Sequence, residues 1–316
     1  MSAAPVVTGG AGFIGSGLVR ALLEAGAPRV VVIDNLSSGK RENLEEVAGR
    51  VDLQVADLRD AAGLPGLIPE GAVVYHLAAI PSVPRSIADP APSHEVNING
   101  TFNLLMAARA RGVRRVVYAA SSSAYGDTEV LPKEEGMRPA PLSPYAAQKL
   151  MGEYYCSVFS SCFGLETVAL RFFNVFGPRQ DPGSPYSGVL SVFMKCVLTG
   201  QAPTIHGDGE QSRDFTYVQD VAELCMKAGQ AAGVAGRVFN AGNGNRYTLN
   251  ETWRMLCRIH GVEIEPQYGA SRPGDVRHSQ ADVTAAVRDL GHAPRFSFEE
   301  GLRRTLAWYA AAGFPE

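Results

Sequence analysis

The feature that most constrains the fold is a series of short, continuous apolar runs in the first 120 residues. They cover residues 30–33, 73–77 and 116–120 and are rich in valine. A continuous run, in contrast to an alternating one, is typical of a strand buried on both faces. Segments with helical spacing of apolar residues, at 13–25 and 93–111, precede or separate these runs. This alternation predicts a parallel sheet with helices on both faces.

The second half of the chain has a different character. Residues 178–188 are rich in Gly, Pro and Ser and are expected to form an irregular loop. The elements expected beyond it are helices at 188–199, 218–228 and 249–259 and strands near 203–205 and 238–241. The sequence contains no repeat and no flexible linker. We therefore expect the two halves to form one body with a cleft between them.

The composition excludes several classes of protein. Lys and Arg number 29 and Asp and Glu number 32, so the formal charge is −3, and binding of nucleic acid through bulk positive charge is not expected. No apolar stretch approaches the roughly 18 residues that span a bilayer, and the first residues lack the basic and apolar regions of a secretion signal, so secretion is not expected. The five cysteines are scattered without a CxxC pair, which predicts neither disulfides nor a metal site. These observations favour a cytoplasmic protein.

A glycine-rich turn follows the short strand expected at residues 6–8. Gly9 permits a tight turn, Gly12 lets a diphosphate approach the backbone, and Gly15 lets the following helix pack close to the sheet. The helix N-terminus presents free N–H groups and a partial positive charge to an anion. Because the turn joins a strand to a helix, it predicts a dinucleotide site. A purely structural turn is the alternative.

Two acidic residues extend this prediction. Asp34 ends the second strand, about 20 residues beyond the glycines, where an acid binds ribose hydroxyls and repels the 2′-phosphate of NADP. It therefore favours NAD; the alternative is a turn residue at a strand end. Asp57 follows a third apolar run at 53–55. Its carboxylate could accept from the adenine amino group or cap the next turn.

Tyr145 and Lys149 form a second candidate site. Ser143 and Pro144 are typical of a helix start, so the two residues are i and i+4 on one helix face. A neighbouring ammonium lowers the pKa of a phenol, and a phenol tuned in this way can act as a base near neutral pH. The alternative is a solvated helix face.

Three serines, 121–123, follow the strand expected at 115–118. Ligands of open α/β sheets bind at the carboxyl ends of the strands. The hydroxyls could therefore bond both a sugar and the tyrosine, or they could form a polar turn that satisfies its own backbone.

Taken together, these motifs resemble the extended short-chain dehydrogenase/reductase superfamily, and within it the nucleotide-sugar 4-epimerases of the UDP-glucose and UDP-N-acetylglucosamine type. The matching segments are TGGAGFIGS (8–16), DNLSSG (34–39), HLAA (76–79), VNINGTFNLL (96–105), SSSAYGD (121–127), SPYAAQK (143–149), LRFFNVFGPRQ (170–180), GDGEQSRDFTYVQD (207–220) and RPGDVRHSQAD (272–282). They cover nearly the whole chain in order.

The resemblance implies an α/β fold, a Rossmann-type doubly wound parallel sheet with a smaller C-terminal α+β substrate-binding lobe. Residues 1–170 would form the NAD-binding domain, to which the chain returns around 214–241. Residues 171–316 would form most of the substrate lobe. A homodimer through two helices is usual for relatives and is expected here. The partner is a UDP-sugar substrate, and no nucleic acid or membrane is expected.

The resemblance also assigns residues to roles. The catalytic residues would be Ser121, Tyr145 and Lys149. NAD would be held by Gly9, Gly12, Phe13, Ile14, Asp34, Asn35, Ser37, Ser38, Gly39, Asp57, Leu58, Leu77, Ala78, Ala79, Asn97, Tyr145 and Lys149. The substrate would contact Ser121, Ser122, Ser123, Tyr145, Asn174, Val189, Arg213, Arg272, Asp275 and Ser279. The arginines suit a diphosphate, which needs charge-assisted donors.

Two positions narrow the expected chemistry. The dehydratases of this superfamily carry an Asp-Glu pair where this chain has Ser122 and Ser123, so the general acid and base for loss of water are missing. An acid is also usual in this segment of UDP-glucuronate decarboxylases. Ser279 lies where related epimerases carry a residue that gates sugar size, and a serine leaves room for a 2-acetamido group.

We therefore expect an NAD-dependent 4-epimerase of UDP-hexoses, including N-acetylhexosamine forms, acting through a transient 4-keto intermediate. The alternatives are a UDP-uronate 4-epimerase, another nucleotide-sugar oxidoreductase or decarboxylase, and a non-catalytic nucleotide-sensing or scaffold protein on the same fold. Retention of both Tyr145 and Lys149 argues against the last of these.

Overall fold

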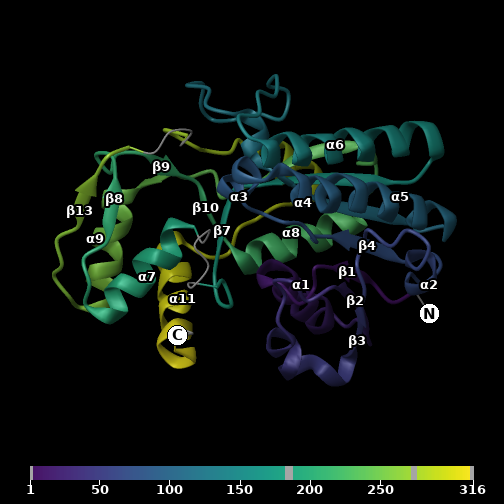
Figure 1. The fold of residues 1–316 in the computed structure, drawn as a ribbon, viewed down its shortest axis with the longest axis horizontal. Helices are drawn as coiled ribbons and strands as arrows, with labels where there is room; N and C mark the ends of the chain where they lie inside the picture. The colour runs from purple at the N-terminus through teal and green to yellow at the C-terminus, as the bar shows by residue number, and fades with distance from the viewer. Residues whose placement is uncertain (1–2, 182–187, 272–275, 314–316) are drawn as a thin grey trace.

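The computed structural model describes residues 3–181, 188–271 and 276–313. Its centre is a seven-stranded parallel sheet in the order β11-β6-β5-β4-β1-β2-β3 (Figure 1). The strands are β1 (Val6–Thr8), β2 (Val30–Asp34), β3 (Val51–Val55), β4 (Val73–His76), β5 (Arg115–Ser121), β6 (Thr167–Phe172) and β11 (Arg237–Ala241). The doubly wound parallel sheet expected from the sequence is confirmed.

Helices cover both faces of this sheet, which explains the continuous apolar runs. One core contains Val7, Val30 and Val32 and the inner faces of α1 (Phe13–Glu24), α8 (Val218–Gln230) and α10 (Thr284–Leu290). The other contains Val6 and Val31 and is covered by α2 (Leu64–Leu67), α5 (Thr101–Ala110) and α6 (Pro144–Phe163). Successive strand side chains point to opposite faces, so both sets of residues must be apolar.

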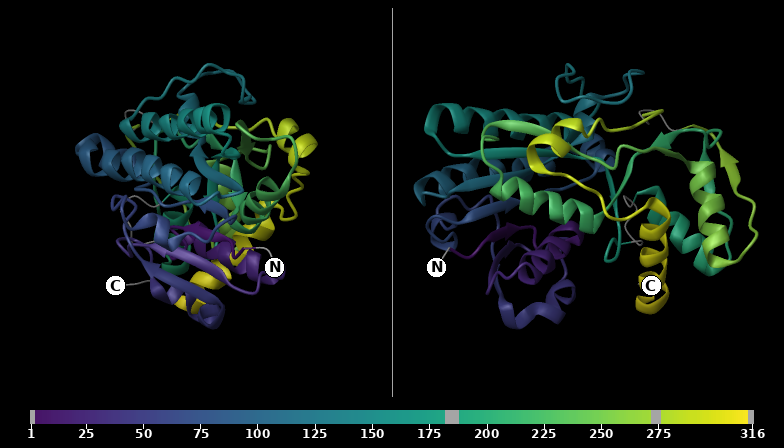
Figure 2. Two further views of the ribbon diagram at one scale, coloured as in Figure 1. Left: turned by 90° about the vertical axis from the view of Figure 1, so that its right-hand side faces the viewer. Right: turned by 180° about the vertical axis from the view of Figure 1, so that it is seen from behind.

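A smaller lobe lies beside one end of the sheet (Figures 1 and 2). Its core includes Phe193, Trp253 and Phe298 and is built around α7 (Val189–Thr199), α9 (Leu249–His260) and α11 (Phe298–Ala312). Its three small sheets pair β7 (Asn174–Phe176) with β10 (Phe215–Tyr217), β9 (Ser212–Arg213) with β12 (Tyr247–Thr248), and β8 (Thr204–His206) with β13 (Gln267–Gly269). The smaller C-terminal α+β lobe is thus present.

The helix expected at 93–111 is present without a break, but it contains a π-helical segment. The chain forms α3 (Val83–Ala88) and α4 (Pro90–His94), then a π-helical segment η2 (Glu95–Gly100), and only then α5. Within η2, the Asn97 side chain accepts from the Ile80 amide at 2.8 Å and donates to Gln148 Oε1 at 2.9 Å. A wider turn places this side chain against both neighbours, a use of π segments that is frequent at functional sites.

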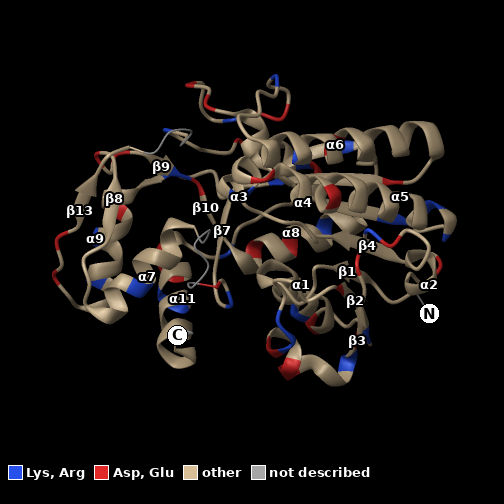
Figure 3. Cartoon of the chain, viewed as in Figure 1, with Lys and Arg blue, Asp and Glu red and all other residues tan. Residues whose placement is uncertain are grey.

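Two short 3₁₀ segments complete the part of the fold that faces the site. They are η1 (Arg41–Arg50), after β2, and η3 (Ser122–Tyr125), after β5. No helix in the described ranges is both long and apolar enough to cross a membrane. Acidic and basic residues are distributed over both lobes (Figure 3).

Candidate active site

A cavity of about 1500 Å³ opens along the carboxyl ends of the sheet strands. It is large enough for two ligands, because single drug-sized ligands occupy about 300–1,000 Å³. Most of the residues expected at the site line it: Gly9, Gly12, Phe13, Ile14, Asp34, Asn35, Ser37, Ser38, Gly39, Asp57, Leu58, Leu77, Ala78, Ala79, Ser121, Ser122, Ser123, Tyr145, Lys149, Asn174, Arg213 and Ser279. The structure therefore brings the residues expected to bind NAD and those expected to bind the substrate into one cavity.

Two expected residues that the structure describes, Asn97 and Val189, are not in this lining. Asn97 is buried in η2 and acts on the loop after β4, since its side chain also donates to the Ile80 carbonyl oxygen at 3.2 Å. Val189 begins α7, next to Gly188, which does line the cavity. Arg272 and Asp275 lie outside the described residues.

The glycine turn forms a cradle whose backbone packs too closely for side chains at Gly9 and Gly15. Gly9 has φ +70°, and a Cβ there would lie 2.7 Å from the Ala78 nitrogen. A Cβ on Gly15 would lie 2.1 Å from the Gly9 carbonyl oxygen. Gly12 is the N-cap of α1, and no side chain caps the helix. The first N–H groups of α1 are thus available to an anion, which fits a dinucleotide diphosphate.

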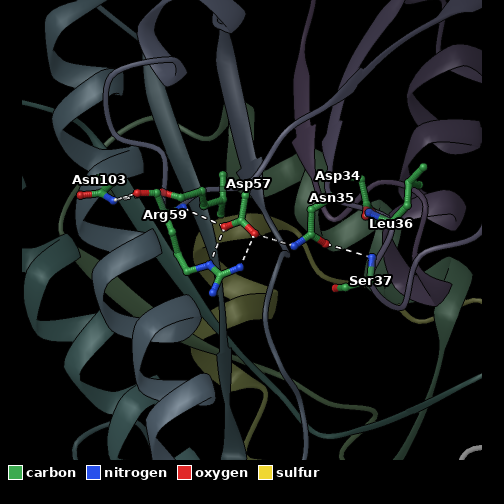
Figure 4. A network of polar contacts seen from close by, with 8 residues as sticks. Asp34, Asn35, Leu36, Ser37, Asp57, Arg59 and Asn103 are labelled. Carbon is green, nitrogen blue, oxygen red and sulfur yellow. Dashed lines mark hydrogen bonds and ion pairs between the residues drawn. The ribbon is translucent and has the colours of Figure 1, made fainter.

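A polar network fixes the loop after β2 (Figure 4). The two carboxylate oxygens of Asp34 accept from the Ala11 amide at 3.0 Å and the Leu36 amide at 2.9 Å. Asn35 Oδ1 accepts from the Ser37 amide at 3.0 Å. The Asp34 carboxylate is therefore held at the end of β2, where it can still accept from ribose hydroxyls through its remaining lone pairs. Both roles considered for this residue are compatible.

Asp57 is tied into the same network. Its carboxylate accepts from Arg59 Nε at 2.9 Å, from an Arg59 terminal nitrogen at 2.8 Å and from Asn35 Nδ2 at 2.8 Å (Figure 4). These contacts, led by the Arg59 guanidinium, hold the pKa of Asp57 well below its usual range. The carboxylate also accepts from the Arg59 amide at 2.9 Å, which is the turn-capping role.

The candidate catalytic residues meet where β5 ends and α6 begins. Ser143 caps α6 by accepting from the Ala146 amide at 3.2 Å, and the Tyr145 amide donates to Ser86 Oγ at 3.1 Å. The Tyr145 phenol lies beside the Ser121 hydroxyl, which acts to lower the pKa of the phenol. Ser123 Oγ donates to Ser121 Oγ at 2.8 Å. A phenol and two hydroxyls therefore converge on one point of the cavity wall.

The pKa values of Tyr145 and Lys149 bear on the expectation that the ammonium lowers the pKa of the phenol. Burial raises the pKa of Tyr145 to about 12, although the Ser121 hydroxyl acts in the opposite direction. Lys149 donates to the Ala119 carbonyl oxygen at 2.8 Å, and its ammonium lies 5.0 Å from the centre of the Tyr118 ring. Burial lowers the pKa of Lys149 to about 8. The expected lowering of the Tyr145 pKa by Lys149 is not found, because burial dominates and the ammonium contacts Ala119 and Tyr118 instead.

The substrate side is assembled from distant segments. Asn174 begins β7 and Arg213 ends β9. The Ser279 amide donates to the Ser212 carbonyl oxygen at 3.0 Å, which places Ser279 beside β9. These residues are far apart in the sequence but line one cavity.

Other lining residues were not singled out from the sequence. Lys133 is 2% exposed, and its ammonium donates to the Thr128 carbonyl oxygen. Trp308 comes from α11. Local sequence around these two carries no signal, because only the fold brings them to the site. Arg179 lies within the 170–180 motif, which could have marked it.

Comparison with known proteins agrees with this geometry. Residues 6–242 match the model of the NAD dependent epimerase/dehydratase family. The UDP-glucose 4-epimerase of Mycolicibacterium smegmatis is 40% identical over 309 residues, covering 96% of this chain and 97% of the relative.

Several solved structures resemble this chain in both sequence and fold. The UDP-N-acetylglucosamine 4-epimerase of Methanobrevibacter ruminantium M1, in complex with UDP-N-acetylmuramic acid, is 39% identical with a TM-score of 0.93, covering 98% of this chain and 99% of that one. The UDP-glucose 4-epimerase of Thermotoga maritima, with UDP-glucose, is 38% identical with a TM-score of 0.92, covering 98% and 99%. Other matches include a dTDP-glucose 4,6-dehydratase and a UDP-glucuronic acid 4-epimerase. The chain therefore belongs to the NAD-dependent epimerase/dehydratase family, within the extended short-chain dehydrogenases/reductases, and its cofactor is NAD.

Proposed function

We propose that the protein is an NAD-dependent 4-epimerase of UDP-hexoses, acting on UDP-glucose and UDP-galactose and on their N-acetylhexosamine forms. The observation that carries this proposal is the meeting of the Tyr145 phenol and the Ser121 hydroxyl in the cavity wall, with Ser122 and Ser123 beside them. This arrangement supplies a proton acceptor for one sugar hydroxyl. It lacks the adjacent acid pair that loss of water from the sugar requires.

The larger sheet and its helices would hold NAD. The glycine cradle and the open N-terminus of α1 suit the diphosphate, and Asp34 suits a ribose without a 2′-phosphate. We propose residues 1–170 as this NAD-binding domain, with the chain returning to it around 214–241, where α8 and β11 join the larger sheet and its core. Residues 171–316 would form most of the substrate lobe.

The chain's own residues would then move one proton and hold the sugar. When bound, NAD⁺ accepts a hydride from C4 and returns it. Tyr145 would take the proton of the sugar 4-hydroxyl and give it back to the 4-keto oxygen, while Ser121 orients that oxygen. Lys149 would keep positive charge near the phenol. Asn174 and Arg213 would bind the diphosphate of the substrate, so that the sugar can turn without leaving.

Sugar selectivity would depend on small side chains at the far end of the cavity. Ser279 is 9% exposed and lines the cavity, where a serine leaves space for a 2-acetamido group. The similarity to both a UDP-glucose and a UDP-N-acetylglucosamine 4-epimerase supports acceptance of both kinds of sugar.

One observation favours a second candidate, a UDP-uronate 4-epimerase. Lys133 is buried yet lines the cavity, so its ammonium could pair with a carboxylate on the substrate. The similarity to a UDP-glucuronic acid 4-epimerase agrees with this alternative.

The test is incubation of the NAD-loaded protein with UDP-galactose, UDP-N-acetylgalactosamine and UDP-galacturonate in separate tubes. The ratio of the two C4 epimers is read by proton NMR. We expect the first two sugars to interconvert with their gluco epimers. Conversion of UDP-galacturonate alone would support the second candidate, and conversion of none would refute both.

We also propose a homodimer formed through α5 and α6. Both helices present large apolar side chains to solvent (in Figure 3 they carry few charged residues). The exposed residues are Phe102, Met106, Met151, Tyr154, Val158 and Phe163. Large exposed apolar side chains gathered on two helices are typical of an interface. Sedimentation should give a dimer mass for the wild type and a monomer mass for Val158→Asp, whereas a wild-type monomer would contradict the proposal.

A further inference from the structure

Asp214 is a fully buried carboxylate between β9 and β10. Its Oδ1 accepts from the Asn243 amide at 2.8 Å. Its Oδ2 accepts from the Gly244 amide at 2.9 Å and the Ala281 amide at 3.0 Å. Burial raises the pKa of this carboxyl to about 6, while the three amide donors act in the opposite direction. Burial of a carboxylate that is held only by neutral groups costs free energy of folding, so such a group is retained only where it has a role.

The same residue reaches a further segment through its backbone. The Asp214 carbonyl oxygen accepts from the Asn174 amide at 3.1 Å and from Asn174 Nδ2 at 3.3 Å. Arg213 is its neighbour in the chain, and Ser279 lies two residues before Ala281. Asp214 thus connects the segments that carry Asn174, Arg213 and Ser279, but it does not itself line the cavity.

The segments around Asp214 pack closely against its carboxylate. A Cβ on Gly242 would lie 2.9 Å from Asp214 Oδ2 and 2.4 Å from Ala281 Cβ. Thr216 adds a longer contact from its hydroxyl to Oδ1, at 3.4 Å. The segments therefore close tightly around one acceptor group, and their mutual spacing depends on it.

We propose that Asp214 is a positioning residue that sets the spacing of Asn174, Arg213 and Ser279 and thereby the affinity for the nucleotide sugar. This inference rests on the proposed function. It explains why a carboxylate is buried there: a single group with two acceptor oxygens can join three backbone amides from two loops. An apolar residue would leave these donors unpaired.

Asp214→Asn is the direct test because it preserves size and replaces one acceptor oxygen by a donor. At least one of the three amides then faces an N–H group. We expect KM for UDP-galactose, and Kd for UDP measured by calorimetry, to rise about tenfold, with kcat reduced much less.

Asp220→Asn is the matched control. Asp220 is also buried, and its carboxylate accepts from the Arg295 amide at 2.8 Å and the Phe296 amide at 3.4 Å, but it does not line the cavity. This variant should lower thermal stability and leave KM and the Kd for UDP unchanged. Equal effects of both variants on KM would reduce Asp214 to a general stabilising residue and overturn the proposal.

Hydrogen exchange separates this inference from the proposed function, because it needs no substrate. In Asp214→Asn, the amides of residues 243, 244 and 281 should exchange faster than in the wild type, and those of α8 should not. If no UDP-sugar is converted but this local change occurs and UDP binds more weakly, only the proposed reaction fails. If Asp214→Asn does not fold, Gly242→Ala, which crowds the same carboxylate, should raise KM and Kd in the same direction. Unchanged values in a folded variant would refute the inference.

Discussion

At the scale of single residues, the account depends on Tyr145. Its phenol lies beside the Ser121 hydroxyl and lines the cavity, but burial makes it a weaker acid, with a pKa of about 12. A base of this kind needs positive charge close by to work near neutral pH. The position of the phenol in the cavity is therefore stronger evidence for its role as a base than its pKa is.

Replacing this phenol should separate catalysis from binding. In Tyr145→Phe we expect turnover to fall by roughly 10²–10⁴, the range for loss of a general acid–base, with NAD still bound. NAD content is measured after denaturing the purified protein. Tyr154→Phe, on the same helix but outside the cavity, is the control and should keep full activity. Near-normal turnover in Tyr145→Phe would remove this residue from the mechanism.

The pH dependence should report on Lys149. Burial lowers its pKa to about 8, so the ammonium is present below that pH and is lost above it. If this charge supports the phenolate, kcat should fall as pH rises through about 8. In Lys149→Arg the fall should move to higher pH, because a guanidinium stays charged. A wild-type rate that continues to rise to pH 9 would contradict this role.

At the scale of secondary-structure elements, His76 joins three of them. Its Nδ1 lies 2.8 Å from Thr8 Oγ1, at the end of β1, and its Nε2 lies 2.9 Å from Thr101 Oγ1, at the start of α5. Burial lowers the pKa of His76 to about 3. The ring is therefore neutral in the folded protein over the whole range in which an unfolded histidine titrates.

This shift predicts a loss of stability in acid. Between about pH 6.5 and pH 3 the unfolded chain takes up a proton at His76 that the folded protein does not, so the free energy of unfolding falls as pH falls. Urea unfolding at pH 7.5 and pH 5 should show a larger drop for the wild type than for His76→Asn. His260→Gln, at an exposed position in α9, should behave as the wild type. Equal drops for all three proteins would show that His76 contributes nothing.

The sequence predicted six strands of the large sheet within two residues, because each is marked by a local apolar run, but it missed β6 (Thr167–Phe172). The π segment at Glu95–Gly100 was missed, since it depends on contacts of Asn97 with distant residues. The small sheets were mostly missed as well. Strands of two or three residues, such as β9 and β12, carry too little pattern, and their pairing joins segments far apart in the chain.

At the scale of the whole molecule, the NAD side of the site could be predicted from the sequence more directly than the UDP-sugar side. The NAD side is formed by turns directly after β1 and β2, so short motifs predict it. The UDP-sugar side depends on segments around residues 174, 213 and 279, which meet only in the folded chain. Motif resemblance located these residues, but not Asp214, whose role is visible only in its contacts.

Ion pairs also connect distant parts of the molecule at the edge of the cavity. Glu46, in η1, accepts from Arg20 Nε at 3.1 Å and from an Arg179 terminal nitrogen at 2.8 Å. Lys40 and Asp181 form a further pair at 3.3 Å. Arg179, Lys40 and Asp181 line the cavity, so these pairs join the segment after β7 to the NAD side.

If these ion pairs help to retain NAD, breaking them should raise the rate of NAD release. Glu46→Gln should speed NAD release a few-fold at low salt, and the difference from the wild type should shrink at high salt, because exposed ion pairs are weak and screened. Release is followed by dilution into excess competing nucleotide. Glu45→Gln, exposed on the same segment, is the control. Identical release rates for both variants at every salt concentration would show that the pairs do not retain the cofactor.

The most direct test of the central claim is the fate of a deuterium atom at C4 of the sugar. UDP-galactose labelled there is converted by the NAD-loaded protein, and the UDP-glucose formed is examined by NMR and mass spectrometry. The account predicts that the deuterium stays at C4, with no NADH released, because the same hydride leaves and returns within one closed site. Loss of the deuterium to solvent, or release of NADH in step with sugar oxidation, would contradict it.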